Sequence, residues 1–226
     1  MYLRLLSAHA VDALVLCIAN DTDESLEQLQ GFRMNGIPVV AFDRFSDKMD
    51  CPLVATDNVE SAKNIVQHLV GNGHTRIACI SEPVRKSYSS RLEGYKQALA
   101  QNGIQYDPKL VMQGDYRYES GYECAKQLLA EHPTAIFACN DMMAYGVYKA
   151  VEENGLKIPD DISVVGFDDL MFSSTMSVPL TTVRQDVDGM CEKICNLVCD
   201  AIDGKFTKEK FAYTATAAYR DSVRKI

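Results

Sequence analysis

The sequence predicts a doubly wound α/β fold with parallel sheets, and three observations carry that prediction. Short apolar runs such as 135–139 and 162–167 lack polar alternation, which is typical of strands covered on both faces. Segments with helical spacing of apolar residues separate these runs, and a strand–helix–strand crossover makes its two strands parallel. The alternation repeats along the whole chain, which indicates a doubly wound parallel α/β architecture.

The first part of the chain follows this pattern after a segment at residues 3–9 that reads as the end of a helix. Strands are expected at residues 11–18, 37–42 and 53–56, with a helix around residues 25–29 between the first two. Asp57 and Glu60 have the spacing of a capping box, which predicts the start of the next helix.

The remaining elements alternate in the same way. Further strands are expected at 76–80, 110–116, 135–139 and 162–167. Helices are expected from Arg91 to about residue 101, at 119–131, between residue 141 and the stop at Gly155, and from 186 to 203. The last of these carries a predicted inward stripe of Met190, Ile194, Leu197, Val198 and Ala201. The alternating segment 211–216 reads as one edge strand.

Composition limits the function. The 226 residues include 23 basic and 31 acidic side chains, for a net charge of −8. No basic cluster stands out, which disfavours binding of nucleic acid or an anionic membrane by this polypeptide itself. No apolar run approaches the roughly 18 residues that a membrane span requires. Eight cysteines, several inside apolar runs, indicate reduced core thiols and a cytoplasmic protein.

Motifs for catalysis, cofactors and metals are absent from the sequence. Gly71–Asn72–Gly73 lacks the third glycine of a dinucleotide fingerprint, and no P-loop, nucleophile elbow or paired-histidine zinc motif occurs. Cys191, Cys195 and Cys199 share one helical stripe, but the outer two would stand about 12 Å apart along the axis, and a zinc site needs about four converging ligands. We therefore predict no enzyme activity, no cofactor and no metal site, and we expect these cysteines to pack a helix face.

Polar residues instead collect where the apolar runs end. Asn140 and Asp141 follow one run, and Asp168 and Asp169 follow the next. Open α/β sheets bind ligands at the carboxyl ends of parallel strands. For Asp141 alone an N-cap role is an equally good interpretation, but the repetition at Asp168 favours a binding site.

The wider candidate site contains hydrogen-bonding side chains and one aromatic ring near strand ends. Its members are Asp43, Arg44, Arg85, Ser87, Arg91, Tyr116, Asn140, Asp141, Asp168 and Gln185. Carboxylates, amides and guanidinium groups can each hold two adjacent hydroxyls, as a sugar presents them, and Tyr116 would supply a ring face. No base–nucleophile pair accompanies them, so we expect binding without chemistry. Polar surface loops would explain any one residue, but not their repeated placement.

A series of short motifs occurs in order along the chain. They are Val11–Asp12, 37–44 (IPVVAFDR), Thr56–Asp57–Asn58, Gly73–His74, 91–95 (RLEGY), Gly114–Asp115, 133–137 (PTAIF), 140–144 (NDMMA), 158–161 (IPDD), 165–169 (VGFDD) and 180–185 (LTTVRQ). Taken together and in order, these motifs resemble the effector-binding core of the LacI/GalR family of bacterial transcription regulators. They span nearly the whole chain, and as an ordered set they are highly specific.

The resemblance implies two α/β lobes joined by three crossing strands, as in periplasmic sugar-binding proteins. The N-terminal lobe would comprise 1–56 with 186–210, and the C-terminal lobe 57–185 with 211–226. The family's helix-turn-helix domain and hinge helix are not in this sequence, and the first two strands and first helix of the N-terminal lobe are expected to be missing. Residues 11–18 would then form an apolar edge strand. Operator DNA would be bound only through the absent domain, by a homodimer.

The resemblance also implies a ligand set. Sugar-binding relatives match at Asp43, Arg44, Arg91, Asn140, Asp168 and Gln185, whereas purine-sensing members match at Arg85, Ser87 and Tyr116. We therefore expect a pentose or hexose, ribose-like or fructose-like, to bind in the cleft between the lobes and favour their closure. A purine-sensing regulator and a sugar-binding transport receptor remain as alternatives, although the receptor would need an export signal and usually avoids eight cysteines.

Overall fold

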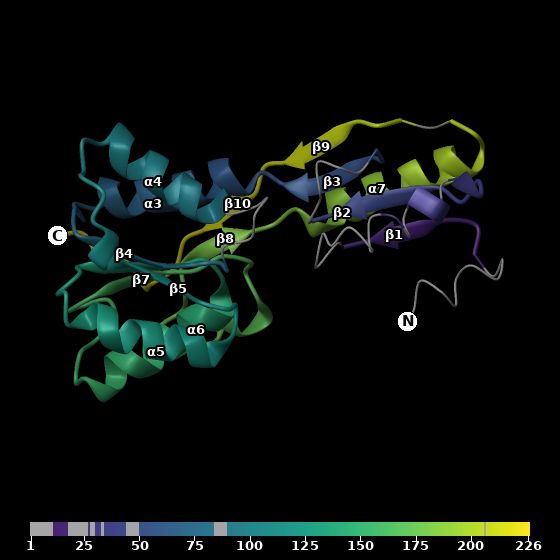
Figure 1. The fold of residues 1–226 in the computed structure, drawn as a ribbon. Helices are drawn as coiled ribbons and strands as arrows, with labels where there is room; N and C mark the ends of the chain where they lie inside the picture. The colour runs from purple at the N-terminus through teal and green to yellow at the C-terminus, as the bar shows by residue number, and fades with distance from the viewer. Residues whose placement is uncertain are drawn as a thin grey trace. The chain divides into compact units, whose positions relative to one another are not determined.

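A computed structural model describes residues 11–17, 27, 30–32, 34–43, 50–83, 90–205 and 207–226. The chain divides into two compact units, residues 1–56 with 186–213 (unit 1) and residues 57–185 with 214–226 (unit 2) (Figure 1). The last division therefore follows Tyr213, whereas the sequence-based boundary was placed after residue 210. The expected helical segment at 3–9 and most of the one at 25–29 lie outside the described residues.

Unit 1 is built on a four-stranded sheet in which every neighbouring pair is parallel. In sheet order the strands are β1 (Leu14–Leu16), β2 (Val39–Phe42), β3 (Leu53–Thr56) and β9 (Lys210–Tyr213). Successive residues of β2 bury opposite faces: Val39 joins the cluster around Phe32, whereas Val40 joins Leu197 of helix α7 (Val187–Ile202). The sheet is thus covered on both faces, as the unbroken apolar runs predicted.

Helix α7 packs through the expected stripe, although only Leu197 is classed as buried, and Met190, Ile194 and Val198 are partly buried against the sheet. The expectation that the three cysteines pack a helix face is wrong, because Cys191, Cys195 and Cys199 are exposed. Each of these cysteines directly follows a residue of the inward-facing side. Consecutive residues of a helix point about 100° apart around its axis. The cysteine stripe therefore faces away from the sheet.

The two ends of this sheet bear on two expectations. Among the described strands β1 pairs with β2 alone, so the expected apolar edge is confirmed for that part of the chain, with Val15 43% exposed. The single edge strand expected at 211–216 is wrong, because β9 ends at Tyr213 and a separate strand, β10 (Thr216–Ala218), pairs antiparallel with β8 (Thr182–Arg184) in unit 2.

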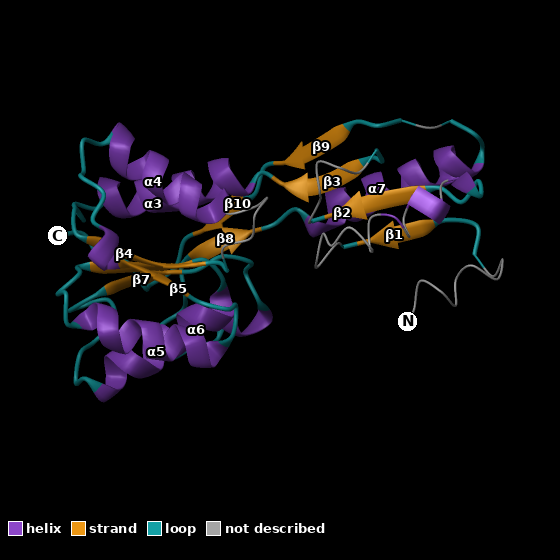
Figure 2. Cartoon of the chain, in the orientation of Figure 1, coloured by secondary structure: helices purple, strands orange, loops and turns teal. Residues whose placement is uncertain are grey.

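Unit 2 has three layers, with a parallel sheet between two helix pairs (Figures 1 and 2). In sheet order the strands are β5 (Val111–Gln113), β4 (Ile77–Ser81), β6 (Ala135–Ala138) and β7 (Ser163–Val165). Helices α3 (Asn58–Gly71) and α4 (Ser90–Gln101) cover one face, and α5 (Tyr118–Leu129) and α6 (Asp141–Glu153) cover the other. Two short 3-10 helices, η1 (Pro108–Leu110) and η2 (Met171–Ser174), complete the unit. The sequence-based α/β fold is confirmed.

Close helix packing in unit 2 depends on glycine. A Cβ atom at Gly94 of α4 would lie 2.3 Å from the Val59 carbonyl oxygen of α3, so only glycine lets these two helices approach so closely. On the opposite face, a Cβ at Gly121 would lie 2.2 Å from the Met143 carbonyl oxygen. The first of these contacts matters for the site, since Gly94 is one turn from Arg91.

Helix starts in unit 2 follow the predicted capping chemistry. Asp57 accepts a hydrogen bond from the Glu60 amide at 3.0 Å, and Asn140 accepts one from the Met143 amide at 3.0 Å. Each side chain satisfies an amide that the helix itself leaves unpaired. Within the described ranges, no helix combines the length and the apolar character needed to cross a lipid bilayer.

Candidate functional site

The candidate site lies at the carboxyl edge of the sheet in unit 2. Cys139 and Asn140 follow β6, Phe167 and Asp168 follow β7, and Gln185 follows β8. The chain beyond β7 runs beside β8 through a parallel bridge between Asp168 and Arg184. Arg91, the second residue of α4, reaches the same edge from the helix layer. The parallel order of the strands is therefore what gathers residues that are distant in sequence.

Arg91 is the most highly connected side chain of this edge. It donates from Nε to Asn58 Oδ1 at 2.8 Å and from Nη1 to the Cys139 carbonyl oxygen at 2.6 Å. Its Nη2 lies 3.2 Å from Asp168 Oδ1, and its guanidinium carbon stands 3.6 Å from the centre of the Phe167 ring. Planar contacts of this kind, with stacking on one face, suit arginine better than lysine. The guanidinium is consequently fixed between the α3/α4 helix layer and the ends of β6 and β7 in the sheet.

Asp168 connects Arg91 to the strand that leads out of the unit. Gln185 donates from Nε2 to Asp168 Oδ1 at 2.9 Å. The backbone of Asp168 has φ 115°, outside the region that L-residues favour, and the Asp168 side chain is 23% exposed. Such backbone geometry costs free energy and collects at ligand sites. Arg91, Asp168 and Gln185, all expected from the sequence, are thus brought together.

Asn140 and Tyr116 meet through the backbone. Besides capping α6 with its oxygen, Asn140 donates from Nδ2 to the Tyr116 carbonyl oxygen at 3.0 Å and is only 7% exposed. Tyr116 has φ 71°, and its ring packs partly against the core. Asn140 therefore fixes the loop that carries Tyr116, in addition to any contact with a ligand.

Asp141 departs from the expected ligand set. It is completely buried, and its carboxylate accepts hydrogen bonds from Ser173 Oγ (2.5 Å), Thr182 Oγ1 (2.6 Å) and the Leu170 amide (2.8 Å). Burial raises the pKa of Asp141 to about 6, although these hydrogen bonds act to lower it. The neighbouring Asn140 is the N-cap, so Asp141 begins the helix and turns inwards. The sequence predicted Asp141 as a ligand contact, but in the structure its carboxylate anchors η2 and β8 instead.

Asp169 also has a structural role. Its carboxylate pairs with Arg220 Nη2 at 2.6 Å and with Arg184 Nε at 2.5 Å, and its side chain is 8% exposed. Burial alone would raise the pKa of Asp169, but the hydrogen bonds from Arg220 and Arg184 bring the pKa below its usual value. No pattern in the sequence pointed to Arg220, which lies 51 positions from Asp169.

Asp43 belongs to unit 1, where it follows β2 with φ 59°. Its amide donates to the Val54 carbonyl oxygen at 2.9 Å, and its carboxylate lies 3.8 Å from Cys17 Sγ. Arg44, Arg85 and Ser87 fall outside the described residues. Their place in the site stays a prediction.

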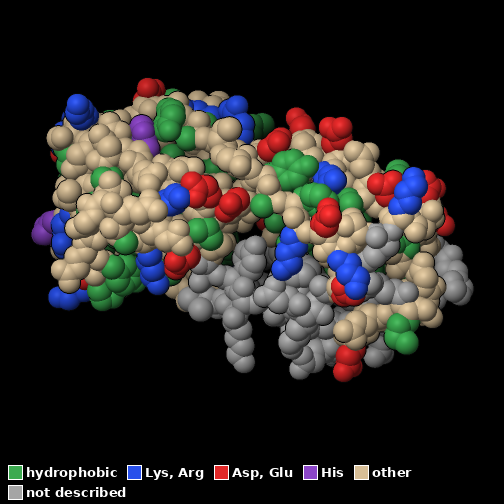
Figure 3. Space-filling view, turned by 90° about the horizontal axis from the view of Figure 1, so that it is seen from above, with side chains coloured by type: hydrophobic (Ala, Val, Ile, Leu, Met, Phe, Trp, Pro, Cys, Tyr) green, Lys and Arg blue, Asp and Glu red, His purple; other side chains and the backbone are tan. Residues whose placement is uncertain are grey.

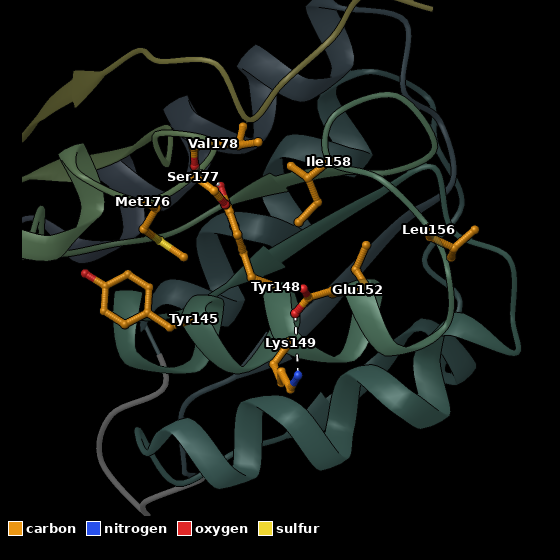
Figure 4. A pocket seen from close by; sticks show the side chains of 10 residues that line it. Tyr145, Tyr148, Lys149, Glu152, Leu156, Ile158, Met176, Ser177 and Val178 are labelled. Atoms are coloured by element: carbon orange, nitrogen blue, oxygen red, sulfur yellow. Dashed lines mark hydrogen bonds and ion pairs between the residues drawn. The ribbon is translucent and has the colours of Figure 1, made fainter.

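A surface pocket of about 340 Å³ also occurs in unit 2 (Figure 4). Tyr145 and Tyr148 of α6 and Met176 line its inner side, and Lys149 and Glu152 stand at the helix surface, where they form an ion pair. None of the candidate ligand residues lines it. On the face visible in Figure 3, acidic and basic side chains are interspersed among the described residues, without a continuous basic surface.

The fold and the strand-edge cluster together define a ligand-binding protein of the periplasmic-binding-protein class. A family model described as a periplasmic binding protein-like domain matches residues 66–223. The chain is 32% identical over 229 residues to the HTH-type transcriptional repressor PurR of Mannheimia succiniciproducens, covering 100% of this chain and 68% of that protein. The chain therefore belongs to the LacI family of regulators, as the motifs indicated.

Solved structures agree with this assignment. The transcriptional regulator CelR in complex with cellobiose superposes with a TM-score of 0.88 at 29% identity, covering 98% of this chain and 68% of that one. A LacI family regulator from Enterococcus faecium with bound ribose has a TM-score of 0.90 at 25% identity, covering 100% and 84%. The chain spans 61% and 62% of the length of the first curated relatives that it matches.

Proposed function

We propose that this chain is the effector-sensing domain of a transcriptional repressor and that it binds a small sugar at the strand edge of unit 2. The cluster of Arg91, Asp168 and Gln185 carries the proposal. It offers a carboxylate within hydrogen-bonding distance of both a guanidinium and an amide, on a rigid support of α4, β7 and β8. Groups fixed in this way lose little freedom when a ligand with several hydroxyls binds.

A pentose or hexose is the favoured ligand because the sugar-type positions outnumber the others. Asn140 and Asp43 belong to the same set, and Arg44 completes it. Structures of similar regulators hold ribose and cellobiose. Tyr116 would present its ring to the C–H face of the sugar. The residues proposed for this ligand in unit 2 are therefore Arg91, Tyr116, Asn140, Asp168 and Gln185, and Asp43 and Arg44 stay the sequence-based candidates of unit 1.

A purine is the second candidate, and a specific observation favours it. The curated proteins that this chain matches include repressors named PurR, and the positions that match purine-sensing members are Arg85, Ser87 and Tyr116. A purine would stack on the aromatic ring and exchange hydrogen bonds along its edge. A sugar-binding transport receptor is a weaker candidate, because no disulfide joins any of the eight cysteines, all of which the structure describes, and such thiols suit a reducing cytoplasm.

In the intact regulator, the effector would act by favouring one arrangement of the protein over another. A ligand shifts such an equilibrium only by its difference in affinity for the two states. Operator DNA would be bound through a separate DNA-binding domain, and the lac repressor dimer, which is similar to this chain, is bound to its operator. The effector domain itself would contribute sensing and dimer formation.

A second copy of the chain would pack on an exposed apolar cluster of unit 2, formed by Met142, Leu170, Met171 and Phe172. Their exposures are 39%, 38%, 76% and 63%. Hydrogen bonds from Ser173 and the Leu170 amide to Asp141 hold η2 against the start of α6, so the cluster has a fixed support. Exposed apolar patches on a rigid surface mark interaction sites.

Thermal melting tests the effector assignment. The chain would be melted alone and with ribose, fructose, cellobiose, hypoxanthine and guanine, since a ligand that binds only the folded state raises the melting temperature. We expect one class to stabilise the protein, and Asp168→Ala to abolish the shift. If a sugar still stabilises the Asp168→Ala variant, the assignment of the site is contradicted. If only a purine stabilises the wild type, the purine becomes the favoured ligand and the sugar the second candidate.

A further inference from the structure

Glu82 is a second carboxylate at the same edge, and no pattern in the sequence pointed to it. It directly follows β4, the strand next to β6 in the sheet, and it is only 3% exposed. Its Oε1 accepts hydrogen bonds from the amides of Arg91 (3.0 Å) and Leu92 (3.4 Å). The carboxylate thus caps the start of α4, although it lies eight residues before that helix begins.

The other carboxylate oxygen, Glu82 Oε2, is buried without a hydrogen-bond partner. Among the described side chains only it and Ser61 Oγ have this property. A buried carboxylate oxygen that has lost its hydration raises the free energy of the folded protein until a donor is supplied. A donor from a bound molecule, or a water that this molecule replaces, would satisfy it.

Glu82 belongs to the neighbourhood of the effector residues. Burial raises the pKa of the Cys139 thiol, the Glu82 carboxylate raises it further, and Arg91 lowers it, so the three groups act on one another electrostatically. Cys139 also pairs with the same strand as Glu82, since its amide donates to the Ile80 carbonyl oxygen at 2.9 Å. The carboxylate with the unpartnered oxygen is therefore the one whose other oxygen accepts the amide of the anchored arginine.

The charges at this edge of the sheet disfavour the binding of an anion. A helix N-terminus and an arginine would ordinarily attract a phosphate. Here Glu82 occupies the N-terminus of α4, and Asp168 lies against the guanidinium of Arg91. A phosphate or carboxylate entering beside Glu82 would meet a second negative charge in a buried setting, where such repulsion is weakly screened.

We infer that Glu82 is a specificity-determining residue that accepts a hydrogen bond from a hydroxyl or N–H group of the effector through Oε2 and rejects effectors carrying a phosphate or carboxylate at that point. This inference rests on the proposed function and narrows it to neutral, donor-bearing molecules. Free sugars and free nucleobases belong to this class, whereas sugar phosphates and nucleotides do not.

Glu82→Gln tests the inference, because glutamine keeps an oxygen for the Arg91 amide and replaces only the charge and the second acceptor. Affinities would be measured by calorimetry for the neutral and phosphorylated members of each pair: ribose and ribose 5-phosphate, fructose and fructose 6-phosphate, hypoxanthine and inosine monophosphate. Loss of a charge-assisted hydrogen bond should weaken binding of the neutral member about tenfold or more, while the phosphorylated member binds no worse. Glu93→Gln removes the same charge from an exposed position of α4 and is the matched control.

The outcomes are separable. A neutral-to-phosphorylated affinity ratio that falls in Glu82→Gln and is unchanged in Glu93→Gln supports the inference, and an equal ratio in the wild type and Glu82→Gln overturns it. If the wild type binds none of these compounds, the proposed function fails. The inference is then tested with inorganic phosphate: greater thermal stabilisation of Glu82→Gln than of the wild type supports it, and equal stabilisation overturns it.

Discussion

Arg91 Nη2 lies 3.2 Å from Asp168 Oδ1, the same oxygen that accepts the Gln185 amide at 2.9 Å. One carboxylate oxygen therefore joins the start of α4, the end of β7 and the segment that leaves β8. Because Gln185 is the last residue of unit 2 before the chain passes to unit 1, a ligand that competes for this oxygen would also act on a connecting segment. Recognition and conformational response would then share one residue.

Asp168→Asn should weaken effector binding while leaving the fold intact. The amide keeps the size of the side chain but removes the charge and one acceptor, so the Arg91 contact and a hydrogen bond to the ligand both weaken. We expect the dissociation constant to rise about 10- to 100-fold, measured by calorimetry with the sugar or purine that stabilises the wild type. Asp221→Asn, at an exposed position of the same unit, should bind normally. Equal affinities in the two variants would contradict the assignment of Asp168.

Asp169→Ala should have the opposite profile, a loss of stability with little direct effect on recognition. The variant leaves Arg220, whose side chain is 15% exposed, without its carboxylate partner. Breaking such a pair costs about 3 kcal/mol in the free energy of unfolding, measured by urea denaturation at pH 7. Arg184→Ala should cost less than about 1 kcal/mol, since Arg184 is 62% exposed.

The Asp169 contribution should also depend on pH. The pKa of this carboxyl is lowered in the folded state, so the stabilisation is present above its unfolded value of 3.8 and is lost as pH falls through the folded pKa. The stability gap between the wild type and Asp169→Ala should therefore narrow in acid. A gap that stays constant down to pH 3 would show that packing, and not the ion pairs, accounts for the loss.

Phe172→Glu should disrupt the proposed homodimer. Phe172 is 63% exposed beside Met171, so a charge at its place costs the monomer little but cannot be buried against a second copy without a partner. We expect the wild type to sediment as a dimer and the variant as a monomer at the same concentration. Met34→Glu, at an exposed position of unit 1, should leave the dimer intact. A dimer that persists in Phe172→Glu would place the interface elsewhere.

The sequence predicted most of unit 2 because its strands are apolar runs and its strand ends carry motif residues such as Asn140 and Asp168. The sequence-based prediction failed for the orientation of Asp141. Because Asn140 is the N-cap, Asp141 is the first residue of α6 and its side chain is buried in the core. Glu82 gave no signal because a single glutamate in a polar loop belongs to no pattern. The division between β9 and β10 was missed because both strands alternate with the same period, so the boundary at Tyr213 leaves no trace in the periodicity.

Asp141→Asn should remove a pH-dependent contribution to stability. The pKa of Asp141 is raised from 3.8 to about 6, chiefly by burial. A raised pKa means that the folded state holds a proton that the unfolded state releases between these values, so this contribution to stability is complete below pH 3.8 and is lost as pH rises through about 6. Asparagine does not titrate, so the stability of the wild type relative to the variant should improve by about 2–3 kcal/mol between pH 7 and pH 4.

The comparison of the two proteins isolates this residue, because all other titrating groups contribute equally to both. Urea unfolding would be followed at pH 4, 5, 6 and 7 for the wild type, Asp141→Asn and the exposed control Asp221→Asn. The variant keeps only one acceptor oxygen for the Leu170 amide, Ser173 and Thr182, which adds a constant loss of about 1–3 kcal/mol at every pH. Curves for the wild type and Asp141→Asn that run parallel would mean that the carboxylate stays ionised in the core, held by Ser173 and Thr182.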